Sequence, residues 1–432
     1  MMTKRQQLFY LFLNLLSAVL LISETTNGIK AVVLVVLSLI MMLRPITLLP
    51  VLFVSSWSVN FVALPGLAAF FYYLVLLGVS VLLWGKRVRT FTKPPHFVIF
   101  AALFAIWIFV TGFFSVSGSW YSSTKLSLVI APLILFSRFH LHGMEFMRKS
   151  LVVIAAFFSV YFMLLSLFFP VDFIIIKETS DFAMETSPSF RSDMNPNTAS
   201  QIVLLIFTIL FCGAFRTKKY WLSIFALFNF VSFMYLGSRT GFFAACIITV
   251  VYLFLVLKTS FIKKTILLLA IVAVFFSLIS GSTRFDRAER LTIYSVQEDN
   301  GSGRFNTWRL LFLDAIPNNL VKGIGVGKEN YEYYGYKVDA DDMYVDLLCQ
   351  TGIVGFVLFL TFYVFTLILL WKKRGGNRDL DFLIAVFLAY LAEGWGESVF
   401  DTPMFWFWGL VAVLAINEKE CIQRKEKIPA NL

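Results

Sequence analysis

The sequence predicts an all-α fold: a polytopic integral membrane protein with about 12–14 transmembrane helices and one large extracytoplasmic loop that contains short helices. Of the 432 residues, 59% are hydrophobic and 15% are charged, whereas soluble domains average roughly 45–50% and about 25%. The apolar runs, at about 17–25 residues each, are long enough to cross the hydrocarbon core of a bilayer. They do not alternate strictly between apolar and polar residues, so they favour helices over the strands of a barrel.

The third observation behind this fold class is the placement of positive charge. The formal net charge is +11, but the basic residues come in short bursts between apolar runs: "GKRVRTFTKPP", "RTKK", "KTSFIKK", "WKKRGGNR" and "KECIQRKEK". Such bursts mark the cytoplasmic ends of spans. The excess of Lys and Arg therefore reports topology, and no nucleic-acid partner is expected.

Threading the chain from a cytoplasmic N-terminus places every burst on the cytoplasmic side. The first apolar run follows Lys4 and Arg5 and lacks an obvious small-x-small cleavage site, so it predicts an uncleaved span. Pro65 and Gly66 interrupt 46–84, which a re-entrant pair would also explain. We expect both termini on the cytoplasmic side of the cytoplasmic (inner) membrane. The fourteen predicted spans are 8–23, 29–43, 46–62, 65–84, 97–115, 122–137, 149–170, 197–215, 220–236, 239–257, 265–280, 350–371, 380–398 and 403–417.

The spans divide the chain into five predicted regions. They are an N-terminal transmembrane bundle (1–176), central spans with a smaller outer loop (177–280), a large extracytoplasmic loop (281–349), C-terminal spans (350–417) and a cytoplasmic basic tail (418–432). Long loops in compact proteins are usually functional or disordered. In the large loop, "FNTWRLLFLDAI" has apolar residues at helical spacing, which predicts an ordered short helix on the outer membrane surface.

Metal and cofactor chemistry find little support in the residue pattern. The four cysteines form no CxxC or Cys/His spacing, so no metal site and no cofactor are expected. The three histidines, His96, His140 and His142, fall in predicted cytoplasmic segments, where solvated or capping roles are usual.

Three arginines stand on the predicted outer side, where topology alone does not call for positive charge. Arg191 lies in "FRSDMNPN", Arg239 in "GSRTG" and Arg304 in "GSGRFNTW". Arginine binds phosphate in a forked, bidentate geometry and stays charged. These residues are candidate ligands for the diphosphate of a lipid carrier, and anchoring to lipid headgroups or to loop carboxylates is the alternative.

An acidic cluster ends the large loop. Asp341 and Asp342 are candidate catalytic bases that would take a proton from a sugar hydroxyl; Asp339 and Asp346 flank them. An N-cap with an acidic first turn is an alternative for either residue, and a calcium-like site is another. The nearby "GIGVG" of 323–327 lacks the strand of a nucleotide fold and predicts a glycine-rich turn that packs close to a substrate.

Two carboxylates fall within the predicted penultimate span. Glu393 and Glu397 are four residues apart and share one helical face, with Asp401 just beyond. Carboxylates at that depth usually face a polar interior. Pairing with the arginines and a proton pathway are both open interpretations.

The order of these motifs resembles a known family. "FRSDMNPN", "GSRTG", "SGRFNTW", "GIGVG" and "DMYVDLLCQTGIVG" follow one another over roughly residues 190–360. This order is similar to that of the O-antigen polymerase and ligase family (Wzy and WaaL type), and most similar to capsular or exopolysaccharide repeat-unit polymerases.

The resemblance implies a metal-independent glycosyltransferase that joins undecaprenyl-diphosphate-linked oligosaccharide repeat units on the outer face of the membrane. It implies that Arg239 and Arg304, and with them Arg191, engage the diphosphate. The ligase branch carries a His-Asn pair eleven residues before the glycine that corresponds to Gly352, where this chain has Asp341 and Asp342, which argues against that branch. The tyrosines of the large loop would suit stacking on sugar rings or an aromatic belt at the interface: Tyr331, Tyr333, Tyr334 and Tyr336.

Expected partners are the lipid-linked oligosaccharide and membrane lipids, with a chain-length regulator and a flippase as candidates. Two other functions remain open: a flippase or transporter of the same lipid-linked unit, and another lipid-linked glycosyltransferase of the O-antigen ligase or peptidoglycan polymerase type. A flippase would favour internal repeats and charges in several spans, and the sequence shows few mid-span charges and no internal repeat.

Overall fold

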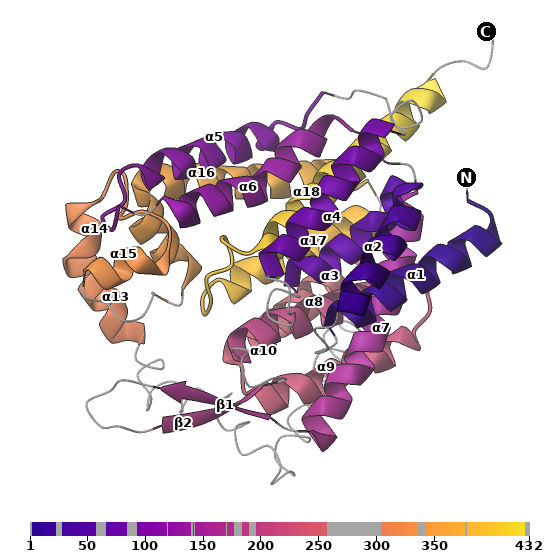
Figure 1. The fold of residues 1–432 in the computed structure, drawn as a ribbon, viewed down its shortest axis with the longest axis horizontal. Coiled ribbons are helices and arrows are strands. Elements are labelled where there is room, and N and C mark those ends of the chain that lie inside the picture. The colour runs from indigo at the N-terminus through magenta and orange to yellow at the C-terminus, as the bar shows by residue number, and fades with distance from the viewer. Residues whose placement is uncertain are drawn as a thin grey trace. The chain divides into compact units, whose positions relative to one another are not determined.

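The structure is a computed structural model and describes residues 2–22, 28–57, 66–83, 93–118, 120–139, 141, 143–169, 171–176, 184–189, 196–256, 304–334, 340, 342–375 and 378–427. Figure 1 shows that helices dominate this part of the chain. The helices that precede the first strand are α1 (Lys4–Ile22), α2 (Gly28–Met42), η1 (Pro45–Leu48), α3 (Leu49–Trp57), α4 (Gly66–Leu83), α5 (Phe97–Gly112), α6 (Tyr121–Leu135), η4 (Phe136–Arg138) and α7 (Met144–Phe168). Those that follow are α8 (Pro196–Thr217), α9 (Leu222–Leu236), α10 (Arg239–Val256), α13 (Arg304–Leu313), α14 (Ala315–Asn318), α15 (Lys328–Tyr333), α16 (Met343–Lys373), α17 (Arg378–Glu393) and α18 (Pro403–Lys427).

The predicted class of a helical, polytopic membrane protein is confirmed. Four of the described helices are long and apolar enough to cross a bilayer, namely α1, α7, α8 and α16, and six further apolar helices are shorter. Every predicted span in the described ranges coincides with a helix, whereas the predicted span at 265–280 lies outside them. Of the predicted span 46–62, the described residues lie in η1 and α3, and residues 58–62 lie outside the described ranges.

One element was not predicted. Strands β1 (Val171–Ile176) and β2 (Met184–Ser189) form an antiparallel hairpin in which Val171 pairs with Ser189 and Ile176 with Met184. The run "VDFIII" follows a span directly, so its apolar residues extend the hydropathic signal of α7 rather than standing out as a strand.

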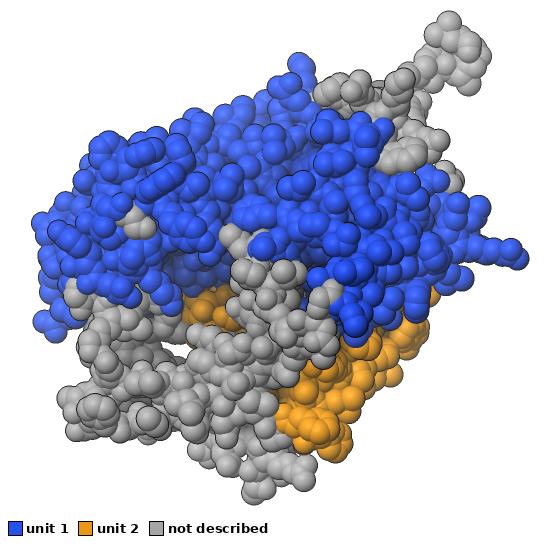
Figure 2. Space-filling view, in the orientation of Figure 1, with its two compact units in different colours: residues 1–151, 306–375, 398–432 blue, residues 152–305, 376–397 orange. Residues whose placement is uncertain are grey.

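The chain divides into two compact units, coloured in Figure 2. Unit 1 contains residues 1–151, 306–375 and 398–432, and unit 2 contains residues 152–305 and 376–397. In unit 1, aromatic rings of α5, α16 and α18 pack into one core, with ring centroids 5.4 Å apart for Phe104 and Phe359 and 5.2 Å apart for Phe362 and Trp406. Aromatic packing of this kind supplies contact area between helices when water provides no hydrophobic driving force.

Buried polar groups fasten helices within each unit. In unit 1, Asn14 of α1 donates to the Ser150 hydroxyl of α7 at 3.4 Å. In unit 2, Asn229 of α9 donates to the Ser159 hydroxyl at 3.1 Å, and Arg216 of α8 pairs with Asp379 of α17 at 2.7 Å. Hydrogen bonds between apolar helices commonly serve as such fasteners.

Candidate functional site

The described residues of the segment from 304 to 342 form an ordered substructure, which we call the loop subdomain. Figure 1 shows its helices α13, α14 and α15 gathered at one end of α16. Their buried side chains form a small core with the first turns of α16: Leu311, Ala315, Ile316, Ile324, Tyr331, Ala340, Val345 and Cys349. The helix predicted for "FNTWRLLFLDAI" is confirmed as α13 and α14. The polar interval is therefore a folded unit in its described part.

Gly352 breaks α16 and explains how the loop subdomain attaches to it. This glycine has φ 65° and ψ −175°, so the helix is interrupted there. The break frees carbonyl groups that an intact helix would use. The Cys349 carbonyl accepts from the Ile324 amide at 2.9 Å, the Gln350 carbonyl from the Gly325 amide at 3.0 Å, and the Thr351 carbonyl from the Trp107 indole at 2.8 Å. "GIGVG" thus completes the hydrogen bonding of a broken helix.

Two glycines allow this close backbone contact: Gly323, the first glycine of "GIGVG", and Gly352 of α16. A Cβ added to Gly323 would lie 2.3 Å from the Gln350 carbonyl oxygen, and one added to Gly352 would lie 2.3 Å from the Val321 carbonyl oxygen. Neither distance leaves room for a side chain. The first glycine of this turn therefore packs on α16, and the expectation that the turn lies close to a substrate stays a prediction.

Buried hydrogen bonds satisfy both backbone groups of Ala340, the residue that precedes the acidic pair. The Ala340 amide donates to Asp346 Oδ1 at 3.1 Å, and the Ala340 carbonyl accepts from the Trp308 indole at 2.7 Å. Asp346 Oδ1 also accepts from the Tyr331 hydroxyl at 2.5 Å. Burial and the neighbouring Asp346 carboxylate raise the pKa of the Tyr331 phenol well above its ordinary value. The phenol therefore stays protonated and donates.

This network was missed by sequence reasoning, and it corrects one expectation. Tyr331 is buried and bonded to Asp346, so it does not present its ring for stacking on a sugar. The Tyr334 hydroxyl accepts from Asn319 at 2.6 Å, whereas Tyr333 is exposed. Tyr336 lies outside the described residues. The one signal in the sequence that could have indicated this network is Asp346, which lies within an apolar run. A carboxylate buried in such a run needs hydrogen-bond donors.

Asp342 is the N-cap of α16. Its Oδ1 accepts from the amides of Tyr344 and Val345, both at 2.9 Å, and its side chain is buried. The capping alternative is therefore confirmed for Asp342. Asp341 lies outside the described residues, and its role as a base stays a prediction.

Substitution of Asp342 separates capping from chemistry. We expect Asp342→Ala to lower the stability of the folded protein by about 1 kcal/mol, because two amides lose their acceptor, and Asp342→Asn to be nearly neutral, because asparagine caps as well as aspartate. Thermal unfolding in detergent measures both. If Asp342→Asn keeps wild-type stability and activity, Asp342 is a cap alone; if it is stable and inactive, the carboxylate also takes part in the reaction.

Arg239 lies at the start of α10, and Arg304 is the first described residue of α13. Their side chains and all of Arg191 lie outside what the structure describes. The first amides of a helix lack intrahelical acceptors and favour anions. Arg239 thus stands where the backbone itself favours negative charge, whereas residues 301–303, before Arg304, lie outside the described ranges.

The start of α10 is closely packed within unit 2. A Cβ added to Gly241 would lie 1.8 Å from the Ser200 hydroxyl oxygen of α8, and one added to Gly396 would lie 1.9 Å from Thr240 Cγ2. Gly241, the second glycine of "GSRTG", is thus explained by close contact between α10 and α8, because small residues let membrane helices approach each other closely. The backbone that carries Arg239 is held from two sides.

Glu393, at the end of α17, is fully buried. Neither of its carboxylate oxygens has a hydrogen-bond partner among the described residues. Its carbonyl accepts from the Gly396 amide at 2.9 Å, which places it one turn from the residue that contacts Thr240. Both interpretations of this carboxylate, pairing with arginine and proton transfer, stay predictions.

Metal ligands are not clustered in the described ranges: no group of three or more His, Cys, Asp or Glu side chains there could hold an ion. His96, the one histidine in these ranges, is exposed and makes no capping hydrogen bond.

Fold and site together define a polytopic helical membrane protein whose folded loop closes on a broken helix. Residues 224–360 match the family model described as O-antigen ligase, a range that runs from α9 into α16. This match confirms the predicted resemblance to the O-antigen polymerase and ligase family over that segment. A search of curated proteins returned no match. The match indicates lipid-linked sugar transfer of the O-antigen ligase or polymerase type.

Proposed function

We propose that the protein is a polysaccharide polymerase that joins undecaprenyl-diphosphate-linked repeat units on the outer face of the cytoplasmic membrane. The observation that carries the proposal is the family match over 224–360, which includes "GSRTG", "SGRFNTW" and "GIGVG". The aspartates that stand at the position of the ligase His-Asn pair favour polymerisation over ligation.

In the proposed reaction, a hydroxyl of one lipid-linked unit attacks the anomeric carbon of the growing chain. The new C–O bond forms as the bond from the anomeric carbon to the diphosphate breaks, and undecaprenyl diphosphate leaves with the electron pair. Asp341 accepts the proton of the hydroxyl. Arg239 and Arg304 stabilise the charge that develops on the leaving group, and Arg191 contributes at the same diphosphate. The helix start at Arg239 supports this assignment, because the first amides of a helix also favour a diphosphate there.

The proposal also fixes a topology and a set of partners. Both termini lie in the cytoplasm, the loop subdomain faces outward, and a flippase supplies the substrate. A chain-length regulator is the expected partner for the product. No metal takes part, because arginine supplies the positive charge.

Deletion of the gene followed by complementation tests the function. Wild-type protein is expected to restore a ladder of glycan lengths on a sizing gel, whereas the deletion strain accumulates single lipid-linked units on the outer leaflet. Asp341→Asn, expressed at a matched level, is expected to give single units only, because the amide cannot accept the proton.

Other outcomes would identify the alternatives. Units trapped on the cytoplasmic leaflet would identify a flippase. Long chains that remain on the lipid carrier and fail to reach their final acceptor would identify a ligase. Long chains at the cell surface of the deletion strain would show that the proposed function is wrong. A normal ladder from Asp341→Asn would show that Asp341 is not the base, while the proposed polymerase function would still stand.

A further inference from the structure

Two helices of unit 1 carry apolar stripes that face away from the protein. On α5 the exposed residues recur at helical spacing, and so do those on α16; the α5 stripe is Ile99, Leu103, Ile106 and Val110, and the α16 stripe is Ile353, Val357, Val364 and Ile368. The opposite face of α5 is buried, as Ala101, Phe104 and Ile108 show. In a polytopic membrane protein, exposed apolar stripes of this length are lipid-facing.

The loop subdomain continues both stripes. The Leu320 carbonyl accepts from the amide of Ile353, the first residue of the α16 stripe, at 2.8 Å. The Lys322 Nζ lies 5.8 Å from the centroid of the Phe114 ring, which follows the end of the α5 stripe. The turn that precedes "GIGVG" is therefore in direct contact with the ends of both lipid-facing surfaces.

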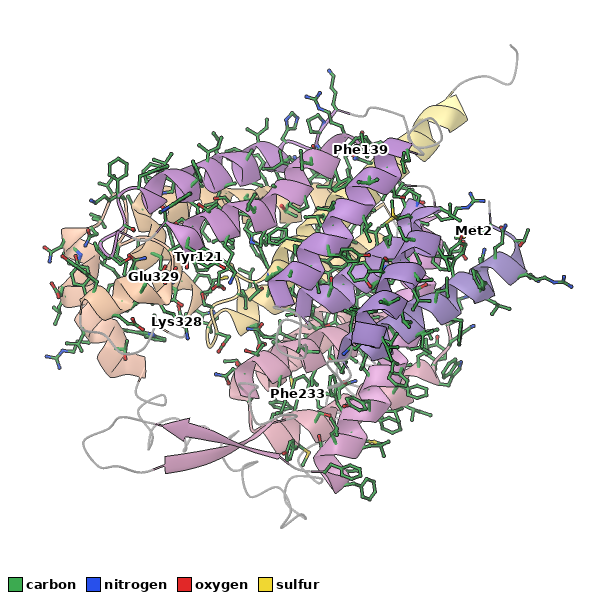
Figure 3. All side chains as sticks on the ribbon, viewed as in Figure 1. Met2, Tyr121, Phe139, Phe233, Lys328 and Glu329 are labelled. Carbon is green, nitrogen blue, oxygen red and sulfur yellow. The ribbon has the colours of Figure 1, made fainter. Side chains whose placement is uncertain are left out.

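Five residues form this continuation, which we call the interfacial patch: Phe113, Phe114, Leu320, Val321 and Lys322. Phe113 is 65% exposed and Val321 is 61% exposed. The Trp120 ring stacks on Phe113 with centroids 6.5 Å apart. Apolar side chains bounded by tryptophan and lysine are typical of the boundary between acyl chains and headgroups. Elsewhere in the loop subdomain, α13 also exposes Leu310, Phe312 and Leu313, whereas α15 begins with the charged residues Lys328 and Glu329, which Figure 3 labels.

We propose that the interfacial patch is immersed in the bilayer and anchors the loop subdomain to it. Leu320, Val321 and both phenylalanines lie among the acyl chains of the nearer leaflet. Lys322 extends its stem along Phe114 and places its ammonium group at the lipid phosphates. The hydrogen bonds of "GIGVG" transmit this anchoring to the start of α16, and thereby set the depth of the loop subdomain in the membrane.

The placement is tested with single cysteines in lipid nanodiscs, where both faces of the bilayer are accessible. Val321→Cys probes the interfacial patch, and Glu332→Cys, at an exposed charged residue of α15, is the aqueous reference in the same subdomain. The parent protein corrects for its native cysteines. We expect a charged maleimide to modify Val321→Cys at least about tenfold more slowly than Glu332→Cys, because access controls thiol reactivity.

A second measurement distinguishes lipid from any other cover. Bimane attached to Val321→Cys is expected to be quenched by lipids brominated on the acyl chain, whereas bimane on Glu332→Cys is not. Equal modification rates would overturn the proposal, and so would slow modification without lipid quenching, because a second copy of the chain would then cover the patch. Leu320→Cys replaces Val321→Cys if the latter does not accumulate.

Discussion

Replacement of Arg239 or Arg304 by alanine is expected to reduce polymerisation by about 10²–10³-fold, the loss seen when one preorganised donor to developing negative charge is removed. Glycan ladders from strains with matched protein levels should collapse to single lipid-linked units. The reason is that each guanidinium, in the proposed site, stabilises the negative charge that develops on the departing diphosphate. Lysine at these positions should restore only part of the activity, since it lacks the planar fork.

The matched control for Arg304→Ala is Arg309→Ala. Arg309 belongs to the same helix, α13, and its side chain is exposed. We expect Arg309→Ala to give a normal ladder. If both variants lose chain length equally, positive charge on the loop subdomain acts in general, and the specific assignment of Arg304 is wrong. If Arg239→Ala and Arg304→Ala both give a normal ladder, the diphosphate binds elsewhere.

The second large effect is expected at the break in α16. Gly352→Ala places a side chain at φ 65° and ψ −175°, a conformation reserved almost entirely for glycine that costs other residues about 1–3 kcal/mol. The added Cβ would also lie 2.3 Å from the Val321 carbonyl oxygen. Relief of both strains would require the loop subdomain to leave α16. We expect loss of activity together with rapid proteolytic cleavage within 304–342.

Gly118→Ala provides the control for backbone strain alone. Gly118 also has a positive φ, 72°, but an added Cβ would meet no atom within 4 Å. It should lower stability only modestly and leave the loop subdomain resistant to protease. If Gly352→Ala is as active and as resistant as Gly118→Ala, the contact between "GIGVG" and α16 is not required.

Hydropathy and charge determined the fold class because they report directly on the solvent around each segment. A helix such as α7 or α16 must be apolar over its length to lie in a bilayer, and the basic bursts between apolar runs predict which end of each span faces the cytoplasm. The order of short motifs was sufficient to indicate the family, which the match over 224–360 confirms. The N-cap alternative for Asp342 could also be predicted from the sequence, because capping depends on the amides of residues two and three positions further along the chain.

The tertiary structure alone decided what the polar residues of the loop touch. Nothing in "GIGVG" indicates that Ile324 and Gly325 supply the hydrogen bonds lost at Gly352, because the partners are separated by 25 residues or more in the chain. The same holds for Trp308, Tyr331 and Asp346, which enclose the Ala340 peptide. Sequence periodicity reports which face of an element avoids water, whereas the pairing of buried donors with acceptors depends on how distant elements pack.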